Sequence, residues 1–424
     1  MLDIKFIREN SEKVKQACNN KRVDCDIDRI LELDERKRKY LKEIEDLRAE
    51  QNKLGKEDIA KAQGIKAQIK EKEPELKNAE TELENLLFLV PNIPLNDVPV
   101  GKDETENKVI RKWGNPAKFD FAPHDHVAIG EKLGLIDIER AGKITGARFS
   151  YLKGDAALLE FALVQYALAV LTSQKTLKKI ASGIGVSDTP FVPVVPPVMI
   201  RPDVFKKMGR LSEQDKNERY YLSQDDLYLI GSAEHTLGPL HMDEVLDEKD
   251  LPLRYLGFST AFRREAGSYG KDTKGILRVH QFDKLEMESF TIPENSLKEQ
   301  NFFVAIQEYL MQGLELPYRV VNVCTGDMGK PDARQIDIET WMPGQGKYRE
   351  THSADLMQDF QARRLNTKVR RKDSPPEFAY MNDATCFAIG RTIIAILENY
   401  QQKDGSVKIP KALQGYMGKK EIKK

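Results

Sequence analysis

The chain has 424 residues, and its 67 lysine and arginine residues balance 67 aspartate and glutamate residues, so the formal net charge is zero. This length predicts two or three domains with a sizeable core. The zero net charge excludes a protein held on nucleic acid by its overall charge, so any nucleic-acid partner must bind a local basic surface.

Cysteine usage and the lack of long apolar runs bear on the compartment. The four cysteines, Cys18, Cys25, Cys324 and Cys386, show no CxxC spacing. We therefore interpret them as reduced thiols, and not as a disulfide framework or a zinc site. The first residues, MLDIKFIREN, lack an apolar secretory core, and no stretch is long enough to span a bilayer. We expect a cytoplasmic protein with no zinc and no membrane contact.

Residues 1–25 predict a short helical start, and two long charged helices follow. Apolar residues recur in both at alternating three- and four-residue spacings, which is the pattern of a coiled-coil seam. The seam positions are Ile30, Leu33, Tyr40, Ile44, Leu47 and Leu54, then Ala62, Ile65, Ile69, Leu76, Ala79, Leu83, Leu86 and Val90, with Lys37, Gln51 and Lys72 in the gaps. With a reversal at Gly55–Asp58, we predict an antiparallel hairpin that is kinked or loses one hydrogen bond at Pro74. By pattern alone, the hairpin is a solvated spacer or a dimerisation rod.

The segment VPNIPLNDVPVG (Val90–Gly101) cannot continue a helix and predicts a domain boundary. We accordingly divide the chain into residues 1–100 and 101–424. Beyond the boundary, His124 and His126 have a spacing that could hold a metal, but no cysteine or carboxylate trio is near them. We therefore favour structural roles for both histidines.

A helix that begins in Ala156–Ile180 is apolar almost all round, so it must be covered on every side. The segment FVPVVPPVMI (Phe191–Ile200) predicts a strand that is broken by Pro196 and Pro197. The following stretch, Leu211–Tyr221, is polar, and we interpret it as mobile.

The stretch Leu253–Glu288 predicts two long strands joined by a glycine-rich, charged loop. Alternate side chains of a strand point to opposite faces. The expected faces are Phe258, Thr260 and Phe262 against Arg263 and Glu265 in the first strand, and Leu277, Val279, Leu285 and Met287 against Arg278, His280, Phe282, Lys284 and Glu286 in the second. Because a buried unpaired charge is costly, the charged face needs a charged ligand or internal pairing. The loop Ala266–Lys274, with two glycines and two lysines, suits a polyphosphate.

The C-terminal part predicts the remaining strands and one more helix. Leu314–Arg370 is expected to form strands with turns at Gly326–Gly329 and Pro343–Gly346. Phe378–Asn382 is expected to be a strand, and Phe387–Tyr400 a buried helix that carries Arg391.

The segment FRREAGSYGKDTKGILRVHQFDKLE resembles motif 2 of the class II aminoacyl-tRNA synthetases, and in particular motif 2 of the seryl-tRNA synthetases. The resemblance covers nearly the whole chain, with motif 1 at about 156–200, motif 2 at about 253–288 and motif 3 at about 378–400. VVNVCTGDMG and WMPGQGKYRETHSADLMQDFQARRL are also very similar to the family, and Ser232-Ala233-Glu234 resembles its Thr-Ala-Glu signature.

The resemblance implies an α+β fold, in which a class II antiparallel sheet is flanked by helices and carries an N-terminal antiparallel coiled-coil hairpin that grips tRNA. It implies a serine–tRNA ligase that activates L-serine with ATP and Mg²⁺ to seryl-adenylate, then transfers the seryl group to tRNA(Ser) and also to tRNA(Sec). It further implies a homodimer built on motif 1, although the helix and strand there would also suit a monomer. Because the attacking carboxylate is already ionised, the first step needs positioning and charge stabilisation and no side-chain base.

The resemblance also assigns the site residues by their positions in this sequence. The catalytic residues are Arg263, Arg391 and Glu286. The ATP-binding residues are Arg263, Arg264, Glu265, Val279, Phe282, Glu350, Thr351, His352, Ser353 and Arg391; the serine-binding residues are Ser232, Ala233, Glu234, Arg263, Glu286 and Thr385; the metal-binding residues are Glu350 and Ser353. Arginine suits this chemistry because its planar fork bonds two phosphate or carboxylate oxygens at once.

Without the resemblance, these residues have simpler interpretations. Arg263 would pair with Glu265 or Glu286 across the strands, Arg391 would form an interhelical ion pair, and Phe282 would belong to the core. The sequence also departs from the family at Asn382-Asp383-Ala384-Thr385, which has one residue more than usual between the asparagine and the hydroxyl. Either Asp383 takes the place of the asparagine, or the turn bulges.

Two rival functions remain open. One is a synthetase-like ligase that loads an amino acid onto a carrier other than tRNA, and the long lysine-rich arm argues against it. The other is a non-catalytic coiled-coil interaction protein that retains an inactive synthetase body. The joint presence of Arg263, Glu286, Glu350 and Arg391 argues against the second, because an inactive site has no physical reason to keep four matched charges.

Overall fold

The computed structural model describes residues 1–55, 58–266 and 274–424. The chain divides into two compact units, Met1–Pro94 and Leu95–Lys424, whereas the proline-rich segment predicted a division at residue 100. The difference arises because the backbone N–H of Leu95 already donates to the carbonyl oxygen of Ala333 (2.8 Å) inside the second unit.

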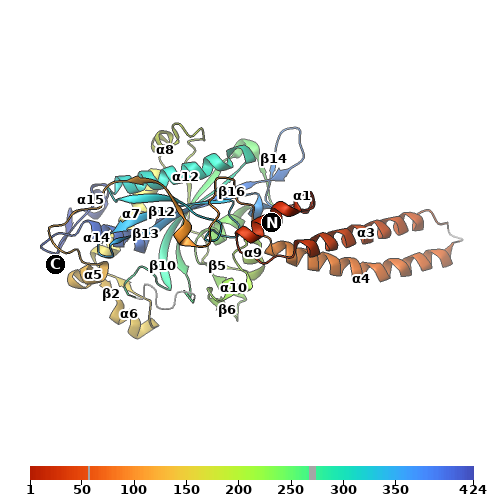
Figure 1. Ribbon diagram of the computed structural model, residues 1–424, viewed down its shortest axis with the longest axis horizontal. Coiled ribbons are helices and arrows are strands. Elements are labelled where there is room, and N and C mark those ends of the chain that lie inside the picture. The colour runs from red at the N-terminus through yellow and green to blue at the C-terminus, as the bar shows by residue number, and fades with distance from the viewer. Residues whose placement is uncertain (56–57, 267–273) are drawn as a thin grey trace. The chain divides into compact units, whose positions relative to one another are not determined.

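The first unit is helical, with α1 (Ile4–Glu9), α2 (Ser11–Asn20), α3 (Ile27–Gln51) and α4 (Ile59–Leu89). Helices α3 and α4 pack together as the predicted hairpin (Figure 1). The 25 residues of α3 span roughly 37 Å at about 1.5 Å per residue. Pro74 lies inside α4 without ending it. Residues 56 and 57 of the expected reversal lie outside the described residues.

The seam between α3 and α4 is apolar but contains charged pairs. Its buried residues include Ile30, Leu33, Ile44, Ile65, Ile69, Ala79 and Leu83, and Leu87 is buried where Leu86 was expected. The predicted seam lysines bind carboxylates of the facing helix: Lys37 lies 3.2 Å from Glu80, and Lys72 lies 2.5 Å from Glu43.

The second unit is built on an eight-stranded sheet (Figure 1). In sheet order its strands are β1 (Lys108–Trp113), β11 (Tyr318–Asn322), β12 (Arg334–Met342), β13 (Lys347–Gln358), β16 (Tyr380–Ala388), β10 (Gln281–Thr291), β9 (Leu253–Phe262) and β4 (Val192–Val194). All neighbours are antiparallel except β4 and β9. This is the antiparallel sheet that the sequence predicted.

Helices cover the apolar face of this sheet. Leu285 and Met287 of β10 and Cys386 of β16 join one core with side chains of α7 (Asp155–Leu171), α12 (Pro293–Gly313) and α14 (Ile389–Asn399). Because side chains alternate along a strand, the neighbouring charged residues of β10 and β16 point to the opposite face. The candidate site therefore lies on the face that these helices do not cover.

Smaller elements surround the sheet. The helices are α5 (His126–Leu133), α6 (Ile138–Thr145), α8 (Gln174–Ala181), α9 (Pro202–Lys207), α10 (Glu213–Lys216), α11 (Glu234–Leu237), α13 (Phe360–Leu365) and α15 (Lys411–Met417). The strands are β2 (Ile136–Asp137), β3 (Tyr151–Leu152), β5 (Met199–Ile200), β6 (Tyr221–Leu222), β7 (Leu227–Leu229), β8 (Val245–Asp247), β14 (Lys368–Arg370), β15 (Glu377–Phe378), β17 (Val407–Lys408) and β18 (Glu421–Ile422). Over the described ranges, no single helix has both the length and the apolar composition needed to cross a membrane, and only the pair α7 and α8, bent by 73°, passes that test together.

Three predicted elements have different bounds in the structure. The second long strand begins at Gln281, so Leu277 and Val279 precede it, although both are buried. The prediction that Phe387 begins the last helix is wrong, because Phe387 pairs with Leu285 and β16 continues to Ala388. The strand predicted at 191–200 is two short strands, β4 and β5, with Pro196 and Pro197 between them.

Candidate active site

One pocket is lined by side chains from segments far apart in the sequence. It lies between the turn after β9, the start of β10, β13 and the start of α14. Of the predicted site residues, Arg263, Glu265, Val279, Phe282, Glu350, Thr351, Thr385 and Arg391 line it. Arg278 and Lys284 also line it. Both were placed on the charged strand face from the sequence, but neither was assigned to the site.

Arg263 is held at one side of this pocket. Its Nε–H donates to the carbonyl oxygen of Gly231 (3.0 Å), and its guanidinium lies over the ring of Phe282, 5.3 Å from the centroid. Its backbone N–H donates to the carbonyl oxygen of His280 (3.0 Å). Without a ligand, Arg263 was expected to pair with Glu265 or Glu286. In the structure, Glu265 accepts a hydrogen bond from Arg278 (2.7 Å), and Glu286 pairs with Lys284.

Arg391 and Glu350 face each other in the same pocket. Nη1 of Arg391 lies 3.4 Å from a carboxylate oxygen of Glu350 and donates to its backbone carbonyl at 2.9 Å. The Glu350 side chain is 54% exposed. The surrounding protein desolvates this carboxylate and acts to raise its pKa, but the charges of Arg391, Arg263 and Lys284 reverse that effect and hold the pKa below its usual value. Glu350 is therefore an ionised carboxylate beside the pocket's arginines.

A buried triad lies deeper in the site. Nζ of Lys284 lies 2.5 Å from Glu286 and donates to the Ser232 hydroxyl (2.9 Å), which in turn donates to Glu286 (3.3 Å). Burial raises the pKa of Glu286 to about 7; the Lys284 ammonium opposes this shift and the Glu234 carboxylate adds to it. Of the two alternatives left open by the sequence, a charged ligand or internal pairing, Lys284 and Glu286 provide internal pairing, and burial still raises the pKa of Glu286 to about 7.

Glu234 is a second buried carboxylate, at the start of α11. Burial acts to raise its pKa, but the charges of Lys284 and Arg210 lower it below the usual value. Nδ1 of His235 accepts the Gly231 N–H (3.1 Å), so a neutral ring carries its proton on Nε2, which lies 3.4 Å from Glu234. Burial and the nearby arginines lower the pKa of His235 well below its usual value, so this histidine is neutral.

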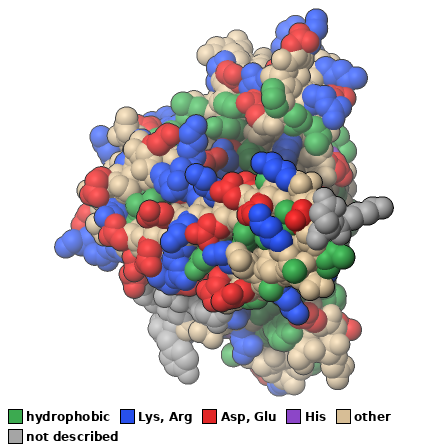
Figure 2. All heavy atoms as spheres, turned by 90° about the vertical axis from the view of Figure 1, so that its right-hand side faces the viewer, with side chains coloured by type: hydrophobic (Ala, Val, Ile, Leu, Met, Phe, Trp, Pro, Cys, Tyr) green, Lys and Arg blue, Asp and Glu red, His purple; other side chains and the backbone are tan. Residues whose placement is uncertain are grey.

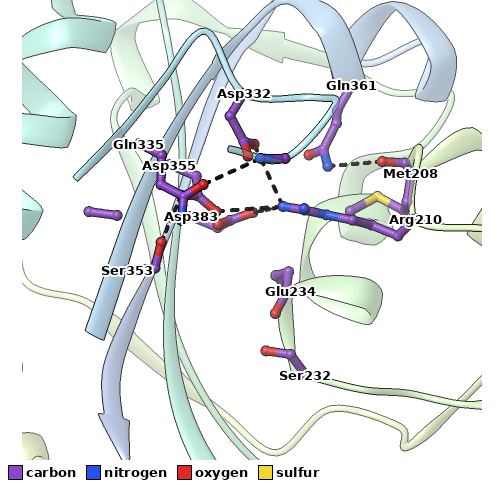
Figure 3. A network of polar contacts seen from close by, with 12 residues as sticks. Met208, Arg210, Ser232, Glu234, Asp332, Gln335, Ser353, Asp355, Gln361 and Asp383 are labelled. Atoms are coloured by element: carbon purple, nitrogen blue, oxygen red, sulfur yellow. Dashed lines mark hydrogen bonds and ion pairs between the residues drawn. The ribbon is translucent and has the colours of Figure 1, made fainter. Parts of the chain in front are cut away.

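A carboxylate cluster around one arginine lies next to Glu234 (Figure 3). Nη2 of Arg210 lies 3.8 Å from Asp332, 3.6 Å from Asp355 and 3.5 Å from Asp383. In the sheet, Asp383 is opposite Asp355 on one side and Glu288 on the other. Burial raises the pKa of Asp355, Asp383 and Glu288 well above the usual value. Sequence reasoning missed this cluster, because its members come from four separate segments.

The predicted serine-contacting residue Thr385 lies beside the triad. It is opposite Glu286, and the register shifts there because Cys386 has no partner on β10. The bulge expected within Asn382–Thr385 is therefore not found there, because these four residues pair consecutively with β10; the register shifts one residue later, at Cys386. Gln307 of α12 donates its side-chain N–H groups to the carbonyl oxygens of Thr385 and Ser353 (both 2.8 Å), which fixes these two strand positions from the core side.

Four further residues that were predicted to belong to the site do not line this pocket. His352 is fully buried against Phe387, and burial lowers its pKa to about 3, so it is a neutral core residue. The Ser353 hydroxyl donates to Asp355 (2.9 Å), in the carboxylate cluster. Arg264 lies over the ring of Tyr220, at 5.4 Å, and Ala233 is buried. The loop residues 267–273, which were expected to face polyphosphate, lie outside the described residues.

The two histidines near the start of the second unit have the structural roles that were favoured. Nε2 of His126 accepts the backbone N–H of Ile276 (3.3 Å), and its Nδ1 lies 3.2 Å from Glu398. A side chain on Gly275 would place its Cβ 1.9 Å from this histidine. His124 exchanges backbone hydrogen bonds with the Gln401 side chain (2.8 and 2.9 Å). His126 therefore fixes the backbone that leads into the pocket.

An eight-stranded sheet, antiparallel except for β4 and β9, with two arginines, an aromatic ring and acidic residues in one pocket defines a class II aminoacyl-tRNA synthetase core. Two family models match the chain: the seryl-tRNA synthetase N-terminal domain over residues 1–94, and the tRNA synthetase class II core domain (G, H, P, S and T) over residues 219–400. A serine–tRNA ligase of Dictyoglomus turgidum is 42% identical, over 100% of this chain and 99% of the relative. The relative from Thermodesulfovibrio yellowstonii is 40% identical, over 99% of each chain.

Two solved structures of seryl-tRNA synthetases are also similar to the chain. The crystal structure of seryl-tRNA synthetase from Pyrococcus horikoshii complexed with ATP matches with a TM-score of 0.90 at 41% identity, over 100% of this chain and 99% of that one. The cytoplasmic serine–tRNA ligase of Naegleria fowleri in complex with AMP matches with a TM-score of 0.87 at 32% identity, over 100% and 99%. The chain belongs to the seryl-tRNA synthetase family. The predicted family and fold class are confirmed, and the core is that of an ATP-dependent aminoacyl-tRNA ligase.

Proposed function

We propose that this chain activates L-serine with ATP to form seryl-adenylate and pyrophosphate, and then transfers the seryl group to a ribose hydroxyl of tRNA(Ser). The observation that carries the proposal is the presence of Arg263 and Arg391 in one pocket, together with Phe282 and Glu350. Two guanidinium groups, an aromatic face and a carboxylate suit a nucleoside triphosphate bound with its counter-ion. The family membership supports the same reaction. Use of tRNA(Sec) as a second acceptor is part of the proposal and follows from the resemblance alone.

In the first step, a serine carboxylate oxygen forms a bond to the α-phosphorus as the bond from that phosphorus to the departing pyrophosphate breaks. No proton has to be removed from the nucleophile. Arg263 would bind the α-phosphate and the reacting carboxylate, Phe282 would stack on adenine, and Arg391 would bind the γ-phosphate. Glu265, Arg264 and the backbone at Val279 would contact the nucleotide. The rate enhancement then comes from positioning and from preorganised positive charge.

Magnesium would be bound mainly by phosphate oxygens and water. Among the described residues, no group of three or more His, Cys, Asp and Glu side chains is arranged to hold a metal. The half-exposed, ionised Glu350 can supply one carboxylate oxygen, which fits a cation that uses one or two protein carboxylates. Ser353 is a weaker second candidate, because its hydroxyl donates to Asp355. When bound, the ion would neutralise charge on the β- and γ-phosphates.

Serine would be selected by the triad and its neighbours. Glu286 and Glu234 are buried carboxylates that can accept hydrogen bonds from the substrate ammonium and hydroxyl, and Ser232 and Thr385 add hydroxyl groups. A site that hydrogen-bonds a hydroxyl rejects an analogue without it, because its own buried polar groups would lose their partner. Alanine would be rejected in this way, and threonine by the close packing around Thr385.

The α3–α4 hairpin would bind tRNA through its lysines and arginines. On the face of the molecule drawn in Figure 2, basic side chains lie among acidic ones and do not form one continuous patch. Separate lysine and arginine side chains on such a surface would each bind a phosphate of the tRNA backbone. Each of these contacts weakens as the salt concentration rises. We assign residues 1–94 to tRNA binding and residues 95–424 to catalysis, with motif 1 at about 156–200, motif 2 at about 253–288 and motif 3 at about 378–400.

We also propose a homodimer, because α7 and the strands after it expose large apolar side chains. Phe161 and Leu158 of α7 are 58% and 48% exposed, and Val192 and Val195 are 54% and 85% exposed. A second copy that covers this face would explain them. Sedimentation should give a dimer, and Phe161→Glu should give monomers. Reduced thiols and a tRNA substrate favour a cytoplasmic site of action.

The deciding experiment is ATP–pyrophosphate exchange with each of the twenty amino acids in turn. Serine alone should support rapid exchange. Exchange with another amino acid would favour the synthetase-like ligase with a different substrate, and no exchange with any would favour the non-catalytic interaction protein. Aminoacylation of tRNA(Ser) and tRNA(Sec) then tests the second step and distinguishes a tRNA acceptor from another carrier.

A further inference from the structure

Arg219 is a charged side chain that neither the resemblance nor the pocket lining assigns. It lies in the polar segment between α10 and β6. Its guanidinium carbon lies 5.5 Å from the centroid of the buried Phe205 ring. Its Nε is enclosed by protein, and across the described part of the chain no hydrogen-bond partner meets that atom. Within the same part, no carboxylate lies within ion-pair distance of its guanidinium. A partly buried cation whose Nε is enclosed without a hydrogen-bond partner is expected to have a ligand.

Arg219 approaches Arg263 across one glycine. Nη1 of Arg219 lies 2.5 Å from the place that a Cβ on Gly231 would occupy. The carbonyl oxygen of the same glycine accepts the Nε–H of Arg263 at 3.0 Å. Any larger residue at this position would displace the Arg219 guanidinium. Both arginines therefore lie against Gly231, Arg219 at its Cα and Arg263 at its carbonyl oxygen.

The segment that carries Arg219 is fixed to the site. The carbonyl oxygen of Glu218 accepts a hydrogen bond from the backbone N–H of Arg264 (3.0 Å). The side-chain carboxylate of Glu218 accepts one from the backbone N–H of Ala266 (3.1 Å). Tyr220 lies beneath the Arg264 guanidinium, at 5.4 Å. These contacts hold Arg219 in place between its neighbours, so its proximity to Arg263 is built into the fold.

Two like charges that approach the same glycine repel each other. Burial, and next the charge of Arg263, lower the pKa of Arg219 to about 10, while the carboxylates of Asp215 and Glu234 oppose the shift only in part. Even so, Arg219 stays charged at neutral pH. An anion bound between the two guanidinium groups would remove the repulsion and supply the missing hydrogen-bond partner.

We propose that Arg219 is a second anion-binding arginine of the active site, which, with Arg263, binds the oxygens of the reacting carboxylate and α-phosphate. The proposal rests on the proposed function and names a further binding residue for that reaction. Its place next to Ser232-Ala233-Glu234 and Arg263 puts it at the amino-acid end of the site, where the serine carboxylate meets the α-phosphorus. The chemistry required of it is bidentate binding of anionic oxygens, which arginine supplies and lysine supplies poorly.

The test compares Arg219→Met, which keeps the stem over Phe205 and removes the charge, with Arg219→Lys and with Arg201→Met. Arg201 is a matched control, because its side chain is 62% exposed and pairs with Asp203 at the surface. Serine-dependent ATP–pyrophosphate exchange and the melting temperature are measured for each protein. We expect kcat/KM for serine to fall ~100-fold or more in Arg219→Met, to fall less in Arg219→Lys and to stay at the wild-type value in Arg201→Met, with unchanged melting temperatures.

The kinetic parameters identify which oxygens are bound. A rise in the KM for serine would assign Arg219 to the carboxylate, and a fall in kcat at constant KM would assign it to the α-phosphate in the transition state. Wild-type kcat/KM in Arg219→Met would overturn the proposal, as would a loss that only follows a lowered melting temperature. Should Arg219→Met fail to fold, Arg219→Lys decides: a loss of ~10-fold with an unchanged melting temperature supports bidentate binding, and wild-type exchange contradicts it. Absence of exchange in the wild-type protein would instead contradict the proposed function itself.

Discussion

Arg263 and Arg391 line the same pocket, although one follows strand β9 and the other lies in the first turn of α14. Each is oriented by a backbone carbonyl, Arg263 by Gly231 (3.0 Å) and Arg391 by Glu350 (2.9 Å). Because these bonds use only part of each guanidinium, both arginines keep N–H groups for a ligand. The sheet therefore brings two preoriented cations to one pocket, and the separate removal of each should affect activity more than folding.

Replacing Arg263 by alanine should nearly abolish ATP–pyrophosphate exchange, by ~10³-fold, because a preorganised cation at the α-phosphate acts mainly in the transition state. The melting temperature and the sedimentation coefficient should stay close to the wild-type values, since the side chain faces a pocket. Arg201→Ala provides the exposed-arginine control. Wild-type-like exchange in Arg263→Ala would remove this residue from the mechanism.

Deleting Asp28–Leu87 should separate the two steps of the reaction. The deletion removes most of the α3–α4 hairpin and no residue of the pocket. Adenylate formation should survive, while tRNA charging should fall ~100-fold or more and lose most of its salt dependence, because the phosphate contacts of the arm are gone. The measurements are exchange and aminoacylation over a series of salt concentrations. Equal loss of both activities in a folded protein would contradict the assignment of the arm.

Much of this arrangement could be predicted from the sequence, because it depends on local patterns. The heptad spacing predicted the hairpin. The alternation in Leu253–Glu288 predicted a charged face that needs a charged ligand or internal pairing, and the Lys284–Glu286 contact provides internal pairing. The resemblance located Arg263 and Arg391 by their motifs. Where an element was predicted from hydrophobicity alone, its bounds differ in the structure. Phe387 was predicted to begin a helix, but it pairs with Leu285 and belongs to strand β16.

The rest of the site depends on contacts that no local pattern encodes. Arg219 lies in the polar stretch Leu211–Tyr221, which the sequence marked only as mobile, and Arg210 directly precedes that stretch. The neighbours of both arginines come from distant strands and turns. Asp332 and Asp355 look like ordinary polar residues of a turn and a strand until the sheet places them around one guanidinium. Likewise, the two strand bulges at Thr351 and Cys386 follow from register and from Gln307, which binds strand carbonyls from the core side.

The affinity for serine should increase as the pH rises through about 7. Burial raises the pKa of Glu286 to about 7, against the opposing charge of Lys284, so the carboxylate that would bind the substrate ammonium is largely protonated below that pH. The KM for serine should then fall as the pH goes from about 6 to about 8, by up to ~10-fold per unit below the pKa. Glu286→Gln should lose this dependence, and the KM for ATP over the same range is the control.

The same shift makes a stability prediction with the opposite trend. Since the folded pKa of Glu286 is raised above the unfolded value, its favourable contribution is complete below about pH 4.5 and is lost as the pH rises through about 7. Glu286→Gln should therefore gain stability relative to the wild type between about pH 5 and about pH 8. A pH-independent difference in the free energy of unfolding, together with a pH-independent KM for serine, would show that Glu286 does not titrate in this range.

Arg210 and Asp383 should be strongly coupled, because this arginine is the cation that faces three buried carboxylates. Removing it in Arg210→Met leaves Asp332, Asp355 and Asp383 without their shared counter-charge, and loss of one partner of a buried ion pair costs ~3–5 kcal/mol. Burial already raises the pKa of Asp355 and Asp383, so protonation should relieve part of this loss at low pH. Arg210→Met should accordingly be more destabilised at about pH 8 than at about pH 5.

Removing one carboxylate should offset part of this loss. In the double variant with Asp383→Asn, fewer negative charges remain, and we expect it to recover ~1–3 kcal/mol relative to the sum of the single variants. The free energy of unfolding of the four proteins, from denaturant titration at both pH values, measures the coupling. Asp226→Asn, which removes an exposed carboxylate that accepts from Tyr221 (2.8 Å), serves as the matched control and should show no coupling to Arg210. Strictly additive losses in Arg210→Met and Asp383→Asn would mean that the cluster is not an electrostatic unit, and that Arg210 contributes only by packing.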